Sequence, residues 1–80
     1  MGINPDEARM MTLFINVKRS KQLDLNQAIK YIHISNEDLK HKLNSLMGKN
    51  NISGKFEGDI LTIQSDIDKF VKLLEAEFIG

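Results

Sequence analysis

The chain has 80 residues, of which 41% are hydrophobic and 28% charged, and its formal net charge at pH 7 is zero; this size predicts a single domain over residues 1–80. The absence of cysteine excludes disulfides, thiolate metal sites and cysteine nucleophiles, as expected for a cytoplasmic or otherwise intracellular protein. No run of residues is apolar for long enough to cross a membrane, so we expect no membrane partner.

The first predicted helix covers residues 6–19. It begins after the only proline, Pro5, and acidic residues occupy its first turn, where they complement the helix dipole. Its apolar positions recur with helical spacing and consist of Met10, Leu13, Phe14 and Val17. This stripe predicts an amphipathic helix that buries one face. Residues 20–23 then connect it to the next helix, and we expect a short strand there.

The second predicted helix covers residues 25–32. Asp24 and Gln27 have the spacing of a capping box, in which the two side chains satisfy free backbone amides. The apolar stripe behind them consists of Leu25, Ala28, Ile29 and Ile32. Only residues 33–35 then separate this helix from the following one, and so short a link predicts a helix-turn-helix.

The third predicted helix covers residues 36–47. Ser35 is its expected N-cap, with Asp38 three residues later, and Gly48 is expected to end it. Its buried stripe consists of Leu39, Leu43, Leu46 and Met47. The methionines at positions 10, 11 and 47 are all predicted to be core fillers, because they lie beside leucine or phenylalanine at helical spacing.

A β-hairpin is predicted over residues 51–64, followed by a helix over residues 66–78. In the hairpin the apolar residues alternate, and Gly58 and Asp59 offer a two-residue turn. Ser65 is the expected cap of the last helix. Its stripe consists of Ile67, Phe70, Val71, Leu74 and Phe78. The predicted class is therefore α+β, and the fold a winged helix: a helix-turn-helix core of three helices, a two-stranded hairpin wing and a C-terminal helix.

The segment NNISGKFEGDILTIQSDIDKFVKLL resembles the winged-helix tails of PCI-type and DDRGK-type proteins, in which a strand ending in glycine, an acidic turn, a strand ending in Ile-Thr and a helix follow one another. Most of the resemblance is carried by Ile52, Gly54, Ile60 and Ile63. FEGD stands where the name-giving DDRGK run would lie. The resemblance implies a protein-interaction module that docks to a second winged-helix domain within a larger complex.

No pattern for chemistry appears in the chain. His33 and His41 are the only histidines and have no obvious third ligand, so we expect no metal site. A phosphate-binding glycine loop, a nucleophile elbow and a histidine-acid-nucleophile set are also absent. We therefore expect a protein that is not an enzyme and uses no cofactor.

Protein docking is the function that the outward face of the third helix favours. The expected partner-binding surface combines this face with the wing and consists of Asn36, Glu37, Lys40, His41, Asn44, Lys55, Phe56 and Glu57. The helix has no arginine, which makes the commonest specific contact to guanine, and its first turn and the wing tip are acidic. We also expect a second surface, on the first or last helix, for a homodimer; apolar Phe78 and Ile79 lie at the end of the last helix, where they could await a partner.

The alternative is a DNA-binding transcriptional regulator. Residues 16–55 hold eight basic residues against three acidic ones, a surplus that can follow a phosphate backbone. The expected phosphate contacts are Lys18, Arg19, Lys21, Lys40, Lys42 and Lys49. This alternative requires these residues to gather on one surface of the folded chain.

Overall fold

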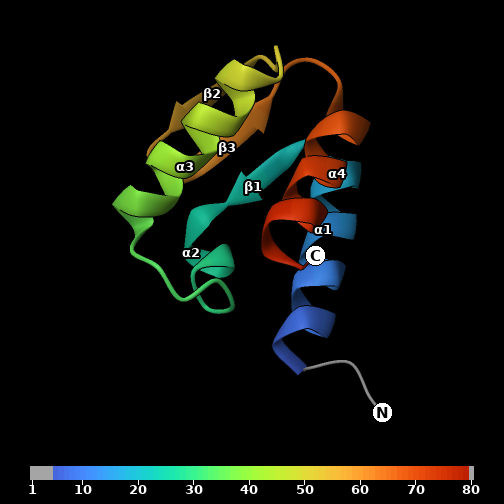
Figure 1. Ribbon diagram of the computed structural model, residues 1–80, viewed down its shortest axis with the longest axis vertical. Coiled ribbons are helices and arrows are strands. Elements are labelled where there is room, and N and C mark those ends of the chain that lie inside the picture. Colours follow the sequence, from blue (N-terminus) through green and yellow to red (C-terminus); the bar gives the residue numbers. More distant parts are fainter. Residues whose placement is uncertain (1–4, 80) are drawn as a thin grey trace.

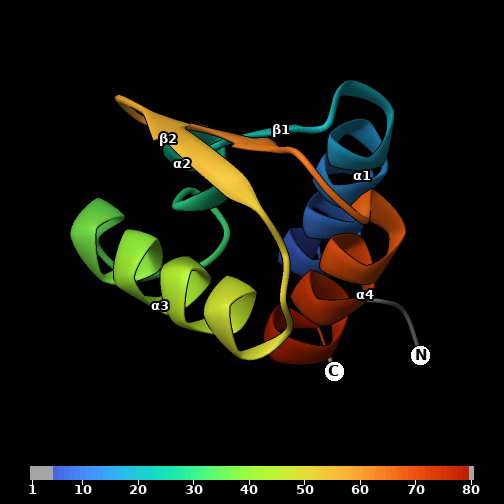
Figure 2. The same cartoon turned by 90° about the horizontal axis from the view of Figure 1, so that it is seen from above.

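The computed structural model describes residues 5–79 and belongs to the α+β class, as predicted (Figure 1). Its elements in chain order are α1 (Pro5–Ser20), β1 (Gln22–Asp24), α2 (Leu25–Ala28), α3 (Asn36–Lys49), β2 (Gly54–Glu57), β3 (Ile60–Ile63) and α4 (Ile67–Phe78). The strands form one antiparallel sheet in the order β1-β3-β2. Figures 1 and 2 show α3 on one side of this sheet, with α1 and α4 packed side by side beyond β1.

The central strand β3 joins a local hairpin to a distant strand. Its hairpin partner is β2, and the turn between them places Gly58 at a φ of 59°, which glycine adopts without a steric penalty. Its other neighbour is β1, in which Leu23 lies opposite Leu61. The short strand predicted at residues 20–23 is therefore present at residues 22–24, where pairing with β3 fixes its position.

Two predicted helix caps are confirmed. The side chain of Asp24 accepts a hydrogen bond from the amide of Asn26, at 2.9 Å, at the start of α2. Ser35 Oγ accepts from the amide of Asp38, at 3.1 Å, at the start of α3. Each satisfies a backbone N–H that has no partner inside its helix, so the local sequence alone defines these two starting points.

The cap predicted for the last helix was wrong by one residue. Asp66, and not Ser65, caps α4 and accepts a hydrogen bond from the amide of Lys69 at 3.1 Å. Ser65 Oγ instead accepts from the amide of Ser53 at 2.8 Å, just before β2. Because that amide belongs to the other arm of the hairpin, the sequence near Ser65 contains no sign of this competing use.

The second helix is shorter than predicted and the third is longer. α2 ends at Ala28, because the amides of Lys30 and Tyr31 donate to the carbonyls three residues before them, those of Gln27 and Ala28, and tighten the chain into a turn. Residues 29–35, and not only 33–35, therefore connect α2 to α3. At its other end α3 continues through Gly48 to Lys49. Gly48 therefore does not end the helix as predicted, and the left-handed conformation after α3 belongs to Asn51, whose φ is 55°.

The core lies between the sheet and the helices and takes residues from every element except β2. Its fully buried large side chains are Phe14, Val17, Leu23, Leu25, Leu39, Leu43, Leu61, Phe70 and Leu74. Met10 and Met47 are buried, as predicted, whereas Met11 is 43% exposed and its prediction as a core filler was wrong. Met11 lies one position off the α1 stripe, so the helical repeat turns it toward solvent. None of the helices within residues 5–79 is long and apolar enough to span a membrane.

Candidate functional site

A groove between α3 and β2 brings together five of the eight residues predicted to bind a partner. It has a volume of about 480 Å³ and is lined by Glu37, Lys40, His41, Asn44 and Phe56. The four α3 residues are spaced three or four apart, so they share one face of the helix. Phe56 lies opposite the fully buried Leu61 in the hairpin register, which places its half-buried ring on the face of the sheet that carries the core.

Lys55 and Glu57 do not belong to this groove. Successive side chains of a strand point to opposite faces, so both residues lie on the outer face of the sheet while Phe56 lies on the inner one. Their charged groups approach each other there, with Lys55 Nζ 3.7 Å from Glu57 Oε1. The surface predicted from the third helix and the wing is thus divided by strand alternation, and only Phe56 of the three β2 residues faces α3.

Two of the predicted residues, Asn36 and Lys40, contact the hairpin turn or a residue bound to it. Lys40 Nζ lies 3.6 Å from Asp59 Oδ1, and the Asn26 amide donates to Asp59 Oδ2 at 3.2 Å. Asn36 in turn donates to Asn26 Oδ1 at 3.3 Å, while the Asp59 carbonyl accepts from the amide of Leu25 at 2.8 Å. Asp59 therefore links the hairpin to α2 and α3, a role that sequence reasoning missed because its partners lie far away along the chain.

The remaining α3 residues of the groove have exposed side chains. Glu37, His41 and Asn44 form no side-chain hydrogen bond or ion pair with any residue in the part of the chain that the structure describes. His41 lies on the solvated face of α3, as predicted. The groove therefore offers a carboxylate, an imidazole and an amide above the half-buried ring of Phe56, a combination of polar and apolar groups.

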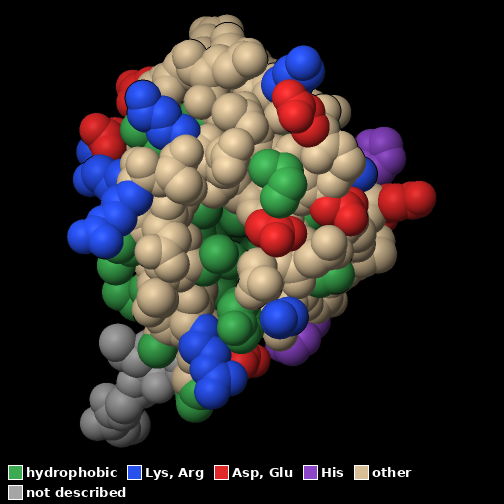
Figure 3. All heavy atoms as spheres, turned by 180° about the vertical axis from the view of Figure 1, so that it is seen from behind, with side chains coloured by type: hydrophobic (Ala, Val, Ile, Leu, Met, Phe, Trp, Pro, Cys, Tyr) green, Lys and Arg blue, Asp and Glu red, His purple; other side chains and the backbone are tan. Residues whose placement is uncertain are grey.

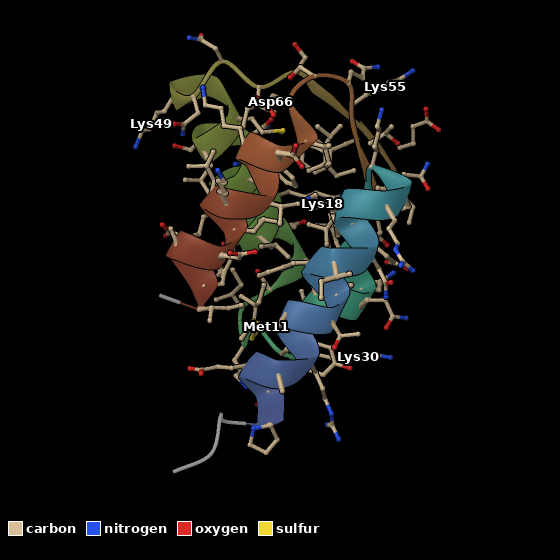
Figure 4. All side chains as sticks on the ribbon, turned by 90° about the vertical axis from the view of Figure 1, so that its right-hand side faces the viewer. Met11, Lys18, Lys30, Lys49, Lys55 and Asp66 are labelled. Carbon is tan, nitrogen blue, oxygen red and sulfur yellow. The ribbon has the colours of Figure 1, made fainter. Side chains whose placement is uncertain are left out.

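The residues predicted to contact phosphates are dispersed over the molecule. Three of the six pair with carboxylates of other elements: Lys18 with Asp68 (3.4 Å), Lys40 with Asp59 (3.6 Å) and Lys42 with Glu77 (2.8 Å). The other three are Arg19, Lys21 and Lys49, all exposed. In Figure 4, Lys18 and Lys49 lie on different elements and point in different directions. Figure 3 likewise shows acidic and basic side chains interspersed on the rear face.

A homodimer surface was predicted on the first or the last helix, and the face that α1 and α4 form together carries exposed apolar side chains. Met11, labelled in Figure 4, is 43% exposed and Ile15 57%. Both line a small hollow together with Glu75 and Ile79. Phe78 is half-buried on another side of α4, where Lys42 Nζ lies 5.5 Å from the centre of its ring.

The histidines lie apart from each other. His33 Nε2 is 3.3 Å from Asp6 Oδ2 near the start of α1, whereas His41 lies in the groove. Among residues 5–79 no group of three or more histidine, aspartate or glutamate side chains could hold a metal ion. Comparison with known proteins gives no match to a family model, to a curated protein or to a solved structure.

Proposed function

We propose that the chain is a non-catalytic winged-helix module that binds another protein through the groove between α3 and β2. The element order supports this reading, since α1, α2 and α3 are followed by the hairpin β2–β3 and by α4. In this reading the hairpin is the wing, α3 is the recognition helix, and the module is similar to the winged-helix tails of PCI-type and DDRGK-type proteins. The partner is then a subunit of a larger complex.

The composition of the groove is the observation that carries the proposal. A half-buried phenylalanine lies beside exposed side chains that have no partner of their own among residues 5–79. Protein interfaces place an aromatic anchor at the centre and satisfiable polar groups around it. Phe56 fits the first role, and Glu37, His41 and Asn44 fit the second.

The charges of the same region weigh against a DNA-binding regulator. A nucleic-acid backbone requires several uncommitted cations on one surface, because each phosphate contact adds to affinity through counterion release. Lys40 and Lys42 already pair with carboxylates, and the free carboxylate of Glu37 lies in the groove itself. A phosphate approaching α3 would therefore meet more repulsion than attraction.

The proposal is tested by locating the surface that a partner covers. The tagged chain is purified with its bound protein from the cells that express it, and the complex is rebuilt with the isotope-labelled chain for chemical-shift mapping. We expect the largest shifts at His41, Asn44 and Phe56, and an affinity loss of about tenfold or more in the double variant H41A/N44A. Lys30→Ala is the matched control, since this exposed residue follows α2 and does not line the groove.

Lys40 stays unchanged in this experiment because its loss would release Asp59 and change the shape of the groove. Shifts confined to the face of α1 and α4 would contradict the proposal. So would salt-sensitive binding of a labelled random duplex, measured by fluorescence anisotropy at low and at near-physiological salt, because backbone binding must weaken steeply as salt rises.

A further inference from the structure

Strand β2 has a free backbone edge. The amide of Gln64, just after β3, donates to the carbonyl of Ser53 at 2.8 Å, so in the alternating pattern of an antiparallel pair the backbone groups of Lys55 and Glu57 face β3. The backbone groups of the residues in between, Gly54 and Phe56, must then point away from β3. Figure 2 shows β2 nearest the viewer, with no helix or strand in front of it. These amides and carbonyls therefore remain available to another strand.

The opposite edge of the sheet is closed. The outward amide of Gln22, in β1, donates to Ser20 Oγ at 3.2 Å. α1, which ends at this serine, packs along β1 as well. The chain thus blocks one edge of its sheet with its own side chain and helix but leaves the other open, so an added strand can pair only with β2.

We propose that two copies of this chain pair through β2, antiparallel and centred on Phe56, so that their three-stranded sheets form one continuous sheet. This inference rests on the function proposed above, because it names the partner of the same groove. In this register Phe56 lies opposite Phe56 of the second copy and exchanges both backbone hydrogen bonds with it. Gly54 lies opposite Gly58 of the second copy, at the start of that copy's hairpin turn, so the pairing spans the length of β2.

Charge complementarity selects this register. On the outer face of the sheet, Lys55 falls opposite Glu57 of the second copy, and the two-fold axis repeats the pair. Together with the contact of 3.7 Å within each chain, the four groups form an alternating square of opposite charges. A register centred on Gly54 would place Lys55 opposite Ser53 and would lack both of these cross-strand pairs.

The inner face of the joined sheet suits the same arrangement. The axis of an antiparallel edge pair is perpendicular to the sheet, so both α3 helices lie on one side and the two grooves meet. The two Phe56 rings then approach each other at the mouths of the grooves, where aromatic pairs add to cross-strand stability. Glu37, His41 and Asn44 of each copy flank the rings and can satisfy one another.

Charge reversal combined with mixing tests the pairing directly. Sedimentation velocity over a concentration series should show a dimer for the unchanged chain. Lys55→Glu and Glu57→Lys, each alone, set like charges opposite one another at two positions and should raise the dissociation constant by about tenfold. The exchange variant K55E/E57K should restore the dimer. A mixture of the two single variants should form a heterodimer, which no effect within one chain can produce.

Lys30→Glu provides the control, because it makes the same charge change in the lower half of the molecule, away from Lys55 (Figure 4). A monomer at every concentration overturns the inference, as does a dimer that neither single reversal weakens. The proposed function fails separately. A monomeric chain whose partner still covers His41 and Asn44 retains the docking groove without self-pairing, whereas a partner bound on α1 and α4 removes the docking proposal whatever the oligomeric state.

Discussion

The α1–α4 pair and the corner between α3 and β2 are held together in different ways. α1 and α4 bury Phe14, Val17, Phe70 and Leu74, each 1% exposed or less, within one core. At the corner Phe56 is only half-buried, and Asp59 connects the elements through polar contacts. Apolar burial stabilises the first region, whereas the second is more open and more polar. If the corner binds a partner as proposed, stability and binding belong to different parts of the molecule.

The largest effect on stability is expected from a substitution in the apolar core between α1 and α4. Phe14→Ala removes a side chain that is 1% exposed and should lower the free energy of unfolding by about 4 kcal/mol. Phe56→Ala should lower it by only about 1 kcal/mol, because part of the ring is already in water. Urea unfolding followed by circular dichroism measures both. Equal losses would mean that the corner is packed as tightly as the α1–α4 pair.

A smaller effect on stability is expected at Gly54, where β2 packs closely against α3. A Cβ atom at Gly54 would lie 2.9 Å from Met47 Sδ and 3.2 Å from the Thr62 carbonyl oxygen, so Gly54→Ala should destabilise the fold by about 1–2 kcal/mol. Gly48→Ala is the matched control: nothing lies within 4 Å of its added Cβ, and this helical position should gain up to about 1 kcal/mol. Thermal unfolding of both variants should show melting temperatures that move in opposite directions.

The smallest effect on stability is expected when a carboxylate that connects elements of the corner, Asp59, is compared with an exposed one, Asp68. Asp59→Ala removes the contacts to Asn26 and Lys40 and should cost about 1 kcal/mol. Asp68→Ala removes only an exposed pair with Lys18 and should change stability by less than about 0.5 kcal/mol. Amide hydrogen exchange sharpens the test, since exchange should speed up at the starts of α2 and α3 in the first variant only. Similar exchange in both variants would show that Asp59 does not link these elements.

Much of the secondary structure could be predicted because its signals are local. Asp24 and Ser35 cap their helices with side chains that reach amides two or three residues away, and the α1 stripe identifies its buried face by spacing alone. The predicted α+β class follows from these periods. The candidate site was predictable in part: helical spacing placed Glu37, His41 and Asn44 on one face, and the predicted wing placed Phe56 across from them. The wing residues Lys55 and Glu57 were wrongly included, because they lie on the other face of the sheet.

The sequence by itself determined that long helices form near residues 6–19, 36–47 and 66–78 and which of their faces are apolar, because these depend on contacts within a few residues. The tertiary structure decided what depends on distant partners. Pairing with β3 defines the position of β1. Lys40 forms an ion pair with Asp59 of the hairpin turn, and Ser65 accepts a hydrogen bond from the amide of Ser53 instead of capping α4. The free edge of β2 belongs to this second group, since a strand becomes an edge only when the order of the whole sheet is known.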